Sequence, residues 1–131
     1  MTLVVDASVI VAALVDSGSD GDWAADILDG HVLAAPHHMP IEAANILRRA
    51  TLSGELTTDS AALAHGDLLA LRIELFPYAP LAERCWQLRE NVTTYDAAYV
   101  ALAEQLGAPL ATVDQRLAAA TGPRCTFATP G

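Results

Sequence analysis

Four acidic residues occupy comparable places in the sequence, each at or near the start of a predicted helix. Asp6 and Asp114 directly follow apolar segments, Asp96 opens a helical segment, and Glu42 lies in the first turns of another. Carboxylates at such positions commonly cap helices, because they accept hydrogen bonds from the free N–H groups of the first turn. Taken singly, each of the four is explained more simply as a helix cap than as a reactive group.

The sequence around these acids alternates between short apolar strands and helices. We expect strands at 2–6, 31–36, 73–78, 109–114 and 125–129. We expect helices at 7–15, 22–30, 59–72, 80–91, 95–107 and 115–121, and a long helix that begins at Pro36 or Pro40 and runs to residue 54. This alternation predicts a single α/β domain over residues 1–131, with a central, mostly parallel sheet covered by helices on both faces.

Parallel topology gives the four acids a second explanation. The carboxyl ends of parallel strands lie along one edge of the sheet together with the starts of the following helices, and ligands usually bind there. Carboxylates gathered at that edge repel one another unless a counter-ion neutralises them. A divalent cation such as Mg²⁺ or Mn²⁺ accepts oxygen ligands without histidine or cysteine, and it activates water for displacement at phosphorus. The set therefore predicts metal-dependent hydrolysis of a phosphodiester bond.

Composition excludes several other chemistries. The 131-residue chain carries a formal net charge of −9, and all seven of its basic residues are arginines. Without lysine there is no Schiff base and no Walker lysine, and the negative charge argues against a broad basic face for nucleic acid.

The apolar run 7–15 is far shorter than the roughly 20 residues that span a bilayer, and no basic signal-peptide region precedes it. We therefore expect a cytoplasmic protein without a membrane anchor.

Three segments of the sequence resemble a known family. These are LVVDASVIVAAL, PIEAANILRRA and TTYDAAYVALAEQLGAPLATVDQRL, and their order and spacing agree over essentially the whole chain. They resemble the PIN-domain ribonucleases, in particular the VapC toxins of bacterial toxin-antitoxin systems. The resemblance implies a three-layer PIN-like fold and an endoribonuclease that hydrolyses RNA phosphodiester bonds to inhibit translation. It also implies a VapB-type antitoxin as partner, and a homodimer.

The resemblance further implies a set of site residues. It assigns catalysis and the binding of Mg²⁺ or Mn²⁺ to Asp6, Glu42, Asp96 and Asp114, and it suggests Ser8 and Thr112 as hydroxyls near the metal.

Three more polar residues are candidates from their spacing. Asn45 and Arg49 lie three and seven residues after the helical glutamate, so they share its helix face. They either line a groove for RNA or form a solvated polar face. Arg116 either contacts a substrate phosphate or pairs with nearby acids.

Two other functions remain open. A phosphatase of the haloacid dehalogenase type also begins with an apolar strand that ends in aspartate. It needs a second acid two residues later, where this chain has Ser8, and a lysine, which is missing. A non-catalytic α/β binding module would use the acids only as helix caps and would bind no divalent metal.

Histidines and tyrosines near the predicted site receive weaker roles. His37 and His38 are adjacent and therefore point in different directions, so we expect solvated imidazoles in a turn. Tyr95 and Tyr99 are weak candidates for substrate contact. Pro40 precedes Glu42 by two residues and leaves the start of that helix, and hence the direction of Glu42, undetermined.

Overall fold

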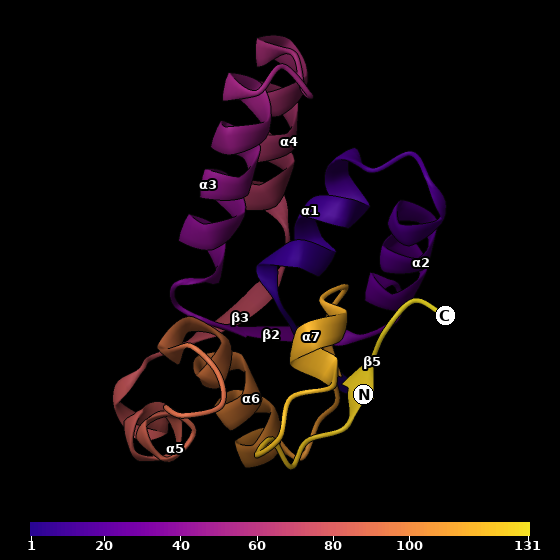
Figure 1. The fold of residues 1–131 in the computed structure, drawn as a ribbon. Helices are drawn as coiled ribbons and strands as arrows, with labels where there is room; N and C mark the ends of the chain where they lie inside the picture. Colours follow the sequence, from indigo (N-terminus) through magenta and orange to yellow (C-terminus); the bar gives the residue numbers. More distant parts are fainter.

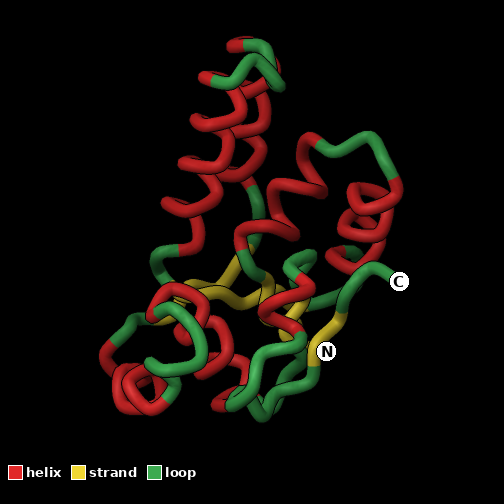
Figure 2. The backbone as a smooth tube through the Cα atoms, viewed as in Figure 1, coloured by secondary structure: helices red, strands yellow, loops and turns green.

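The computed structural model describes all residues 1–131 and is built around a five-stranded sheet. The strands are Thr2–Val5 (β1), Val32–Pro36 (β2), Ile73–Phe76 (β3), Leu110–Ala111 (β4) and Phe127–Ala128 (β5). Their order across the sheet is β3-β2-β1-β4-β5, and every neighbouring pair is parallel. Figure 2 shows these short strands at the centre of the chain, surrounded by helices and loops. The predicted parallel sheet is therefore confirmed, and no antiparallel strand is added to it.

Helices cover both faces of this sheet (Figure 1). They are Ala7–Val15 (α1), Ser19–Leu28 (α2), Met39–Leu52 (α3), Thr58–Ala70 (α4), Ala82–Gln87 (α5), Thr94–Leu106 (α6) and Gln115–Ala118 (α7). Helices α1 to α4 lie on one face, where α3 and α4 form a hairpin that projects away from the sheet, and α5 and α6 lie on the other. The three-layer α/β fold is thus confirmed. No helix combines the length and the apolar character needed to cross a bilayer.

Several predicted element boundaries were wrong. The strand predicted at 109–114 pairs only at 110–111, and the strand predicted at 125–129 only at 127–128. The helix predicted at 80–91 is a 3₁₀ turn at Ala79–Leu81 followed by the short α5, and the helix predicted at 22–30 already begins at Ser19. A strand ends where its hydrogen bonds to the neighbouring strand end, and the apolar pattern of the sequence does not show that point. The pattern therefore overestimated the strand lengths.

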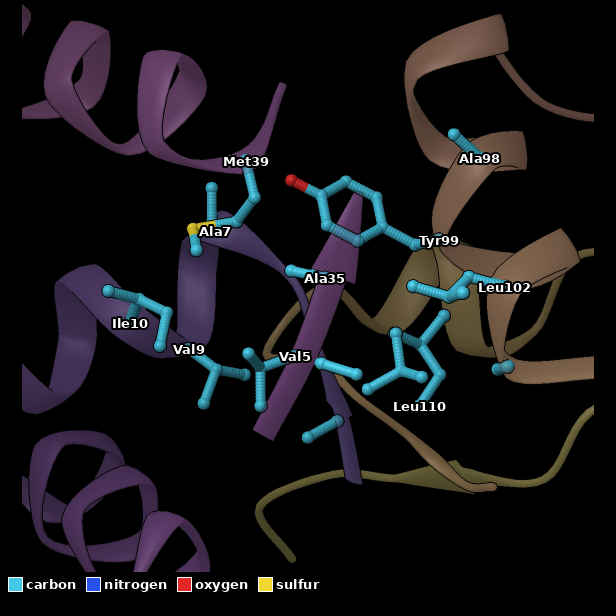
Figure 3. Close-up of a cluster of buried hydrophobic side chains, with 14 of the residues drawn as sticks. Val5, Ala7, Val9, Ile10, Ala35, Met39, Ala98, Tyr99, Leu102 and Leu110 are labelled. Carbon is cyan, nitrogen blue, oxygen red and sulfur yellow. The ribbon is translucent and has the colours of Figure 1, made fainter. Parts of the chain in front are cut away.

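Helix α6 is the central element of the core. Every residue from Ala97 to Ala103 is buried, because the helix packs on β1, β2 and β4 with one side and on α5 with another. A helix that is apolar all round is typical of such a fully packed position. Figure 3 shows Tyr99 and Leu102 projecting from this helix toward Ala35 and Leu110 of the sheet. The core therefore fixes α6, and with it the position of Asp96.

The order in which strands are added to the sheet changes side at β1. β2 and then β3 are added on one side of β1, and the chain then crosses over so that β4 pairs with the other side of β1. Val5 is in register with Ala111, and the Asp6 amide donates to the Ala111 carbonyl over 3.2 Å. Such a reversal opens a crevice beyond the carboxyl ends of the two strands, which is where parallel α/β folds bind ligands.

A partly buried ion pair ties α5 and the C-terminal segment to α6. The Arg84 guanidinium donates to both carboxylate oxygens of Glu104, over 2.7 and 3.1 Å, and also to the Gly122 carbonyl. The Arg124 amide donates to the same carboxylate over 2.7 Å. Although burial alone would raise the pKa of Glu104, these donors lower it below its ordinary value of 4.5. Glu104 therefore stabilises the packing of three segments while it is ionised.

We expect Glu104→Gln to lower the free energy of unfolding by about 2 kcal/mol at pH 7, because charge-assisted hydrogen bonds of this kind contribute that much. The pKa of Glu104 is lower in the folded than in the unfolded chain, so its contribution is complete above pH 4.5 and is lost as the pH falls through the folded value. Urea unfolding at pH 7 and at lower pH measures both effects.

The matched control is Glu90→Gln, which changes an exposed acid with no hydrogen bond to the protein. Equal stability of the Glu104 and Glu90 variants at pH 7 would contradict the structural role of the ion pair.

Candidate functional site

Asp6 lies at the point where β1 passes into α1. It is the N-cap of α1: its Oδ1 accepts from the Val9 amide over 3.1 Å and from the Ser8 hydroxyl over 2.6 Å. The residue is only 6% exposed. Its capping role is real, yet a cap normally sits at the surface, whereas this carboxylate is buried at the strand edge.

The end of β4 lies beside Asp6 and is held to it by hydroxyl groups. The Ser8 hydroxyl, which donates to Asp6, accepts from the Val113 amide over 3.2 Å. The fully buried Thr112 accepts from the Asp114 amide through its hydroxyl. Burial raises the pKa of Asp6, and the hydroxyls of Ser8 and Thr112 oppose part of that rise. Both hydroxyls expected near the site are therefore next to Asp6.

Asp114 is a second N-cap, at the start of α7. Its Oδ1 accepts from the Arg116 and Leu117 amides over 2.9 and 3.3 Å. The side chain of Arg116 is 96% exposed, and its Nε lies 3.8 Å from the same Asp114 oxygen. Such an exposed pair contributes little to stability, so Arg116 is free to turn toward a ligand.

Asp96 lies in the first turn of α6, where Thr93 is the cap. The Thr93 hydroxyl accepts from the Asp96 amide over 3.2 Å, so Asp96 is not the capping residue itself. Together with Asp114 and Arg116, Asp96 lines a hollow of about 220 Å³ at the starts of α6 and α7. The hollow is open and polar, and it places two of the four acids on one surface.

Glu42 reaches the same region from α3. This helix begins at Met39 with Pro40 in its first turn, so the helix start that the sequence left undetermined is at the second of the two prolines. The Tyr99 hydroxyl donates to Glu42 Oε1 over 2.6 Å, and His38 Nε2 lies 3.0 Å from the same oxygen. Burial alone would raise the pKa of Glu42, but these two partners outweigh it and lower the pKa.

The four carboxylates are near enough for their charges to act on one another. Burial raises the pKa of Asp96, and the charges of Glu42 and Asp114 raise it further. Burial also raises the pKa of Asp6, to which the charge of Asp96 adds. Asp96 thus interacts electrostatically with each of the other three, and the exposed Arg116 offsets only part of this repulsion at Asp96.

The four carboxylates do not form a closed coordination shell in this conformation. No three of the histidine, cysteine, aspartate and glutamate side chains lie close enough to bind one metal ion together. The set nevertheless fits a hard divalent cation, because its donors are all oxygens and because Mg²⁺ usually keeps several waters and takes only one or two carboxylates from the protein.

Two of the expected residues lie on the same helix as Glu42, farther from its start. Asn45 and Arg49 are exposed on α3, and no contact joins either of them to the acidic residues. Arg49 instead lines a separate hollow farther along α3, with Ile46 and Glu55.

Two residues of the site were given the wrong environment by the sequence. His38 was expected to be a solvated imidazole, but its ring packs against Tyr99 at 5.0 Å between centroids and its Nε2 contacts the Tyr95 carbonyl over 3.1 Å. Tyr99 was a weak candidate for substrate contact, but it is 1% exposed and reaches only Glu42. The sequence did contain one indication of this contact: His38 and Glu42 are four residues apart, a spacing that brings two side chains together on a helix.

Comparison with known proteins agrees with this architecture. The sequence matches the PIN domain family over residues 3–123. Ribonuclease VapC1 of Mycobacterium tuberculosis is 45% identical over 123 residues, which cover 93% of this chain and 92% of that protein. The chain therefore belongs to the PIN domain family, within its group of VapC ribonucleases.

Solved structures share the fold. The crystal structure of PAE2754 from Pyrobaculum aerophilum has a TM-score of 0.73 at 26% identity and covers 97% of this chain and 83% of that one. The structure of VapBC2 from Rickettsia felis, bound to a DNA fragment from its promoter, has a TM-score of 0.66 at 13% identity and covers 98% of both chains. At that identity the second comparison shows the fold alone.

We expect Asp6→Asn to raise the melting temperature in the presence of EDTA. The substitution keeps the acceptor oxygen for the Val9 amide but removes a buried charge, whose cost is of the order of 1 kcal/mol, or about 4 °C in a domain of this size. Differential scanning calorimetry at pH 7 measures the change.

Asp67→Asn, which changes an exposed acid on α4, serves as the control and should leave the melting temperature within about 1 °C. A lower melting temperature for Asp6→Asn would mean that its capping bonds outweigh the buried charge.

Proposed function

We propose that this chain is a metal-dependent endoribonuclease, the toxin of a VapBC-type toxin-antitoxin pair, which hydrolyses RNA phosphodiester bonds and thereby inhibits translation. Its membership of the VapC ribonucleases supports the activity. The observation that carries the proposal is the placement of Asp6, Glu42, Asp96 and Asp114 at one edge of the sheet, where burial and like charges raise the pKa values of Asp6 and Asp96, although Arg116 partly opposes the rise at Asp96. Helix capping alone would not require four acids to face one another.

We assign the binding of Mg²⁺ or Mn²⁺ to these four carboxylates. When bound, such an ion would activate water and stabilise the charge that develops at the phosphate. We place Asp6 and Asp96 at the centre of this set, because Asp6 follows the end of β1 and Asp96 lines the hollow at the starts of α6 and α7. Asp114 and Glu42 flank Asp96, and their charges add to the negative potential that attracts a cation.

The remaining polar residues orient this set or contact the substrate. Ser8 and Thr112 hold Asp6 through their hydroxyls, so its carboxylate has one orientation at the edge of the sheet. Arg116 extends into solvent beside the hollow of Asp96 and Asp114, where its guanidinium is suited to an RNA phosphate. Asn45 and Arg49 are exposed and remain candidates for contact with more distant parts of the RNA.

The partners follow from charge and family. A net charge of −9 favours a basic protein partner, and a VapB-type antitoxin is the partner that the family implies. We also propose a homodimer, which would bring the few arginines of two chains to one RNA, and action in the cytoplasm, where cellular RNA is found.

RNA cleavage by the purified chain should require Mn²⁺ or Mg²⁺ and should stop in EDTA. We expect Asp96→Asn and Asp6→Asn to lower kcat by roughly 100-fold or more, because each removes a charge that holds the ion and the ion contributes several kcal/mol to the transition state. Gel analysis of structured RNAs, with and without metal, measures the rates.

Asp67→Asn is again the control and should cleave at the wild-type rate. Two results would contradict the proposed site: equal RNA cleavage by wild type and both site variants, or no cleavage and no metal binding by any of the three. The second result would mean that the four acids are helix caps and that the chain is a binding module.

Assembly gives an independent test of the proposed partners. Light scattering should show the free chain as a dimer, and it should show a larger complex when a basic VapB-type antitoxin is added. Because charge attraction speeds this association, the rate of complex formation should fall as salt is raised. A monomer at micromolar concentration, or an association that salt does not affect, would contradict this part of the proposal.

A further inference from the structure

Glu42 is held by two donors that come from different parts of the fold. Tyr99 belongs to α6, and His38 directly precedes α3, the helix that carries Glu42 itself. Both donors use the same carboxylate oxygen, Oε1, over 2.6 and 3.0 Å, and no hydrogen bond joins Oε2 to the protein. One oxygen of Glu42 is therefore fixed, while the other is left available.

The donors themselves have little freedom. The Tyr99 ring is 1% exposed and packs in the core, and Figure 3 shows its hydroxyl oxygen directed past Ala35 toward Met39 at the start of α3. His38 Nε2 lies 3.1 Å from the Tyr95 carbonyl and 3.0 Å from Glu42. Because a carbonyl and a carboxylate only accept, this nitrogen must carry the hydrogen and donate. The edge of the imidazole also packs against the Tyr99 ring.

The result is an ionised glutamate with a set orientation. Both donors lower the pKa of Glu42, so the carboxylate is charged at neutral pH, and its charge acts on Asp96. Hydrogen-bond partners of this kind hold a metal-binding side chain in its binding orientation before the metal arrives, so less conformational entropy is lost on binding. Their removal typically lowers metal affinity by 10-fold to 100-fold.

We propose that Tyr99 and His38 are positioning residues that orient Glu42, with Oε1 restrained by the protein and Oε2 presented to the metal. The inference rests on the proposed function, because it assumes that Glu42 takes part in metal binding. It adds to that function a pair of residues that touch neither RNA nor the ion.

Tyr99→Phe is the decisive variant, since it removes one buried hydroxyl and keeps the packed ring. Isothermal titration with Mn²⁺ should show about 10-fold weaker binding than wild type. In RNA cleavage at fixed metal concentration, kcat should fall while the KM for RNA stays unchanged, because Tyr99 does not reach the substrate. Tyr78→Phe removes a half-exposed hydroxyl that has no hydrogen bond, and it should match wild type in both measurements.

A double-mutant comparison separates positioning from general destabilisation. If Tyr99 acts through Glu42, Tyr99→Phe should have no further effect on Mn²⁺ affinity in a Glu42→Gln background. A purely structural hydroxyl would instead lower the melting temperature in EDTA and leave Mn²⁺ affinity unchanged in either background.

His38 gives the second arm of the test. His38→Ala should weaken Mn²⁺ binding, and His38→Gln, whose amide N–H can replace the Nε2 donor, should restore most of the affinity. Thermal unfolding in EDTA shows whether each variant is folded before its affinity is compared.

The outcomes are distinguishable. Unchanged or tighter Mn²⁺ binding by Tyr99→Phe, with wild-type binding and cleavage intact, would overturn the positioning role and leave the proposed function standing. Failure of the wild type to bind Mn²⁺ or to cleave RNA would overturn the proposed function, and the positioning role with it.

Discussion

Repulsion between carboxylates is the constraint on which this structure depends. Burial and the charges of Glu42 and Asp114 raise the pKa of Asp96, and burial together with the charge of Asp96 raises the pKa of Asp6. Such an arrangement costs stability in the absence of a cation, and a protein keeps it only where function requires it. The rest of the fold supplies the rigidity that holds like charges together: β1 and β4 in register, and an α6 that is buried along its whole middle section.

The repulsion is moderated largely by neutral donors, with His38 and the exposed Arg116 as the basic residues beside Glu42 and Asp114. Hydroxyl groups of Ser8 and Thr112 serve Asp6, backbone amides of α7 serve Asp114, and Tyr99 serves Glu42. Neutral donors fix the direction of a carboxylate without cancelling its charge. A lysine or arginine in their place would satisfy the same oxygens but would also remove the attraction for a cation. The absence of lysine from the whole chain is consistent with this requirement.

The sequence was sufficient for the architecture and for much of the site, for a physical reason. Alternating apolar strands and helices allow few topologies other than a parallel sheet between two helical layers, and such a sheet brings Asp6 and Asp114 to one edge. The environment of Tyr99 and His38 could not be predicted from the sequence, because it depends on how α6 packs against the start of α3. Periodicity shows which face of a helix is apolar, but it does not show which buried tyrosine has a carboxylate within reach of its hydroxyl.

The hydrogen bond between Tyr99 and Glu42 joins the two helical layers at the edge of the sheet. Tyr99 is anchored in the layer that contains α5 and α6, and Glu42 belongs to the opposite layer, whose α3–α4 hairpin projects far from the core. A tilt of that hairpin therefore changes the distance between donor and acceptor at its base, where a shift of about 1 Å breaks a hydrogen bond. The orientation of Glu42 therefore depends on how the two helical layers pack against each other, and not on α3 alone.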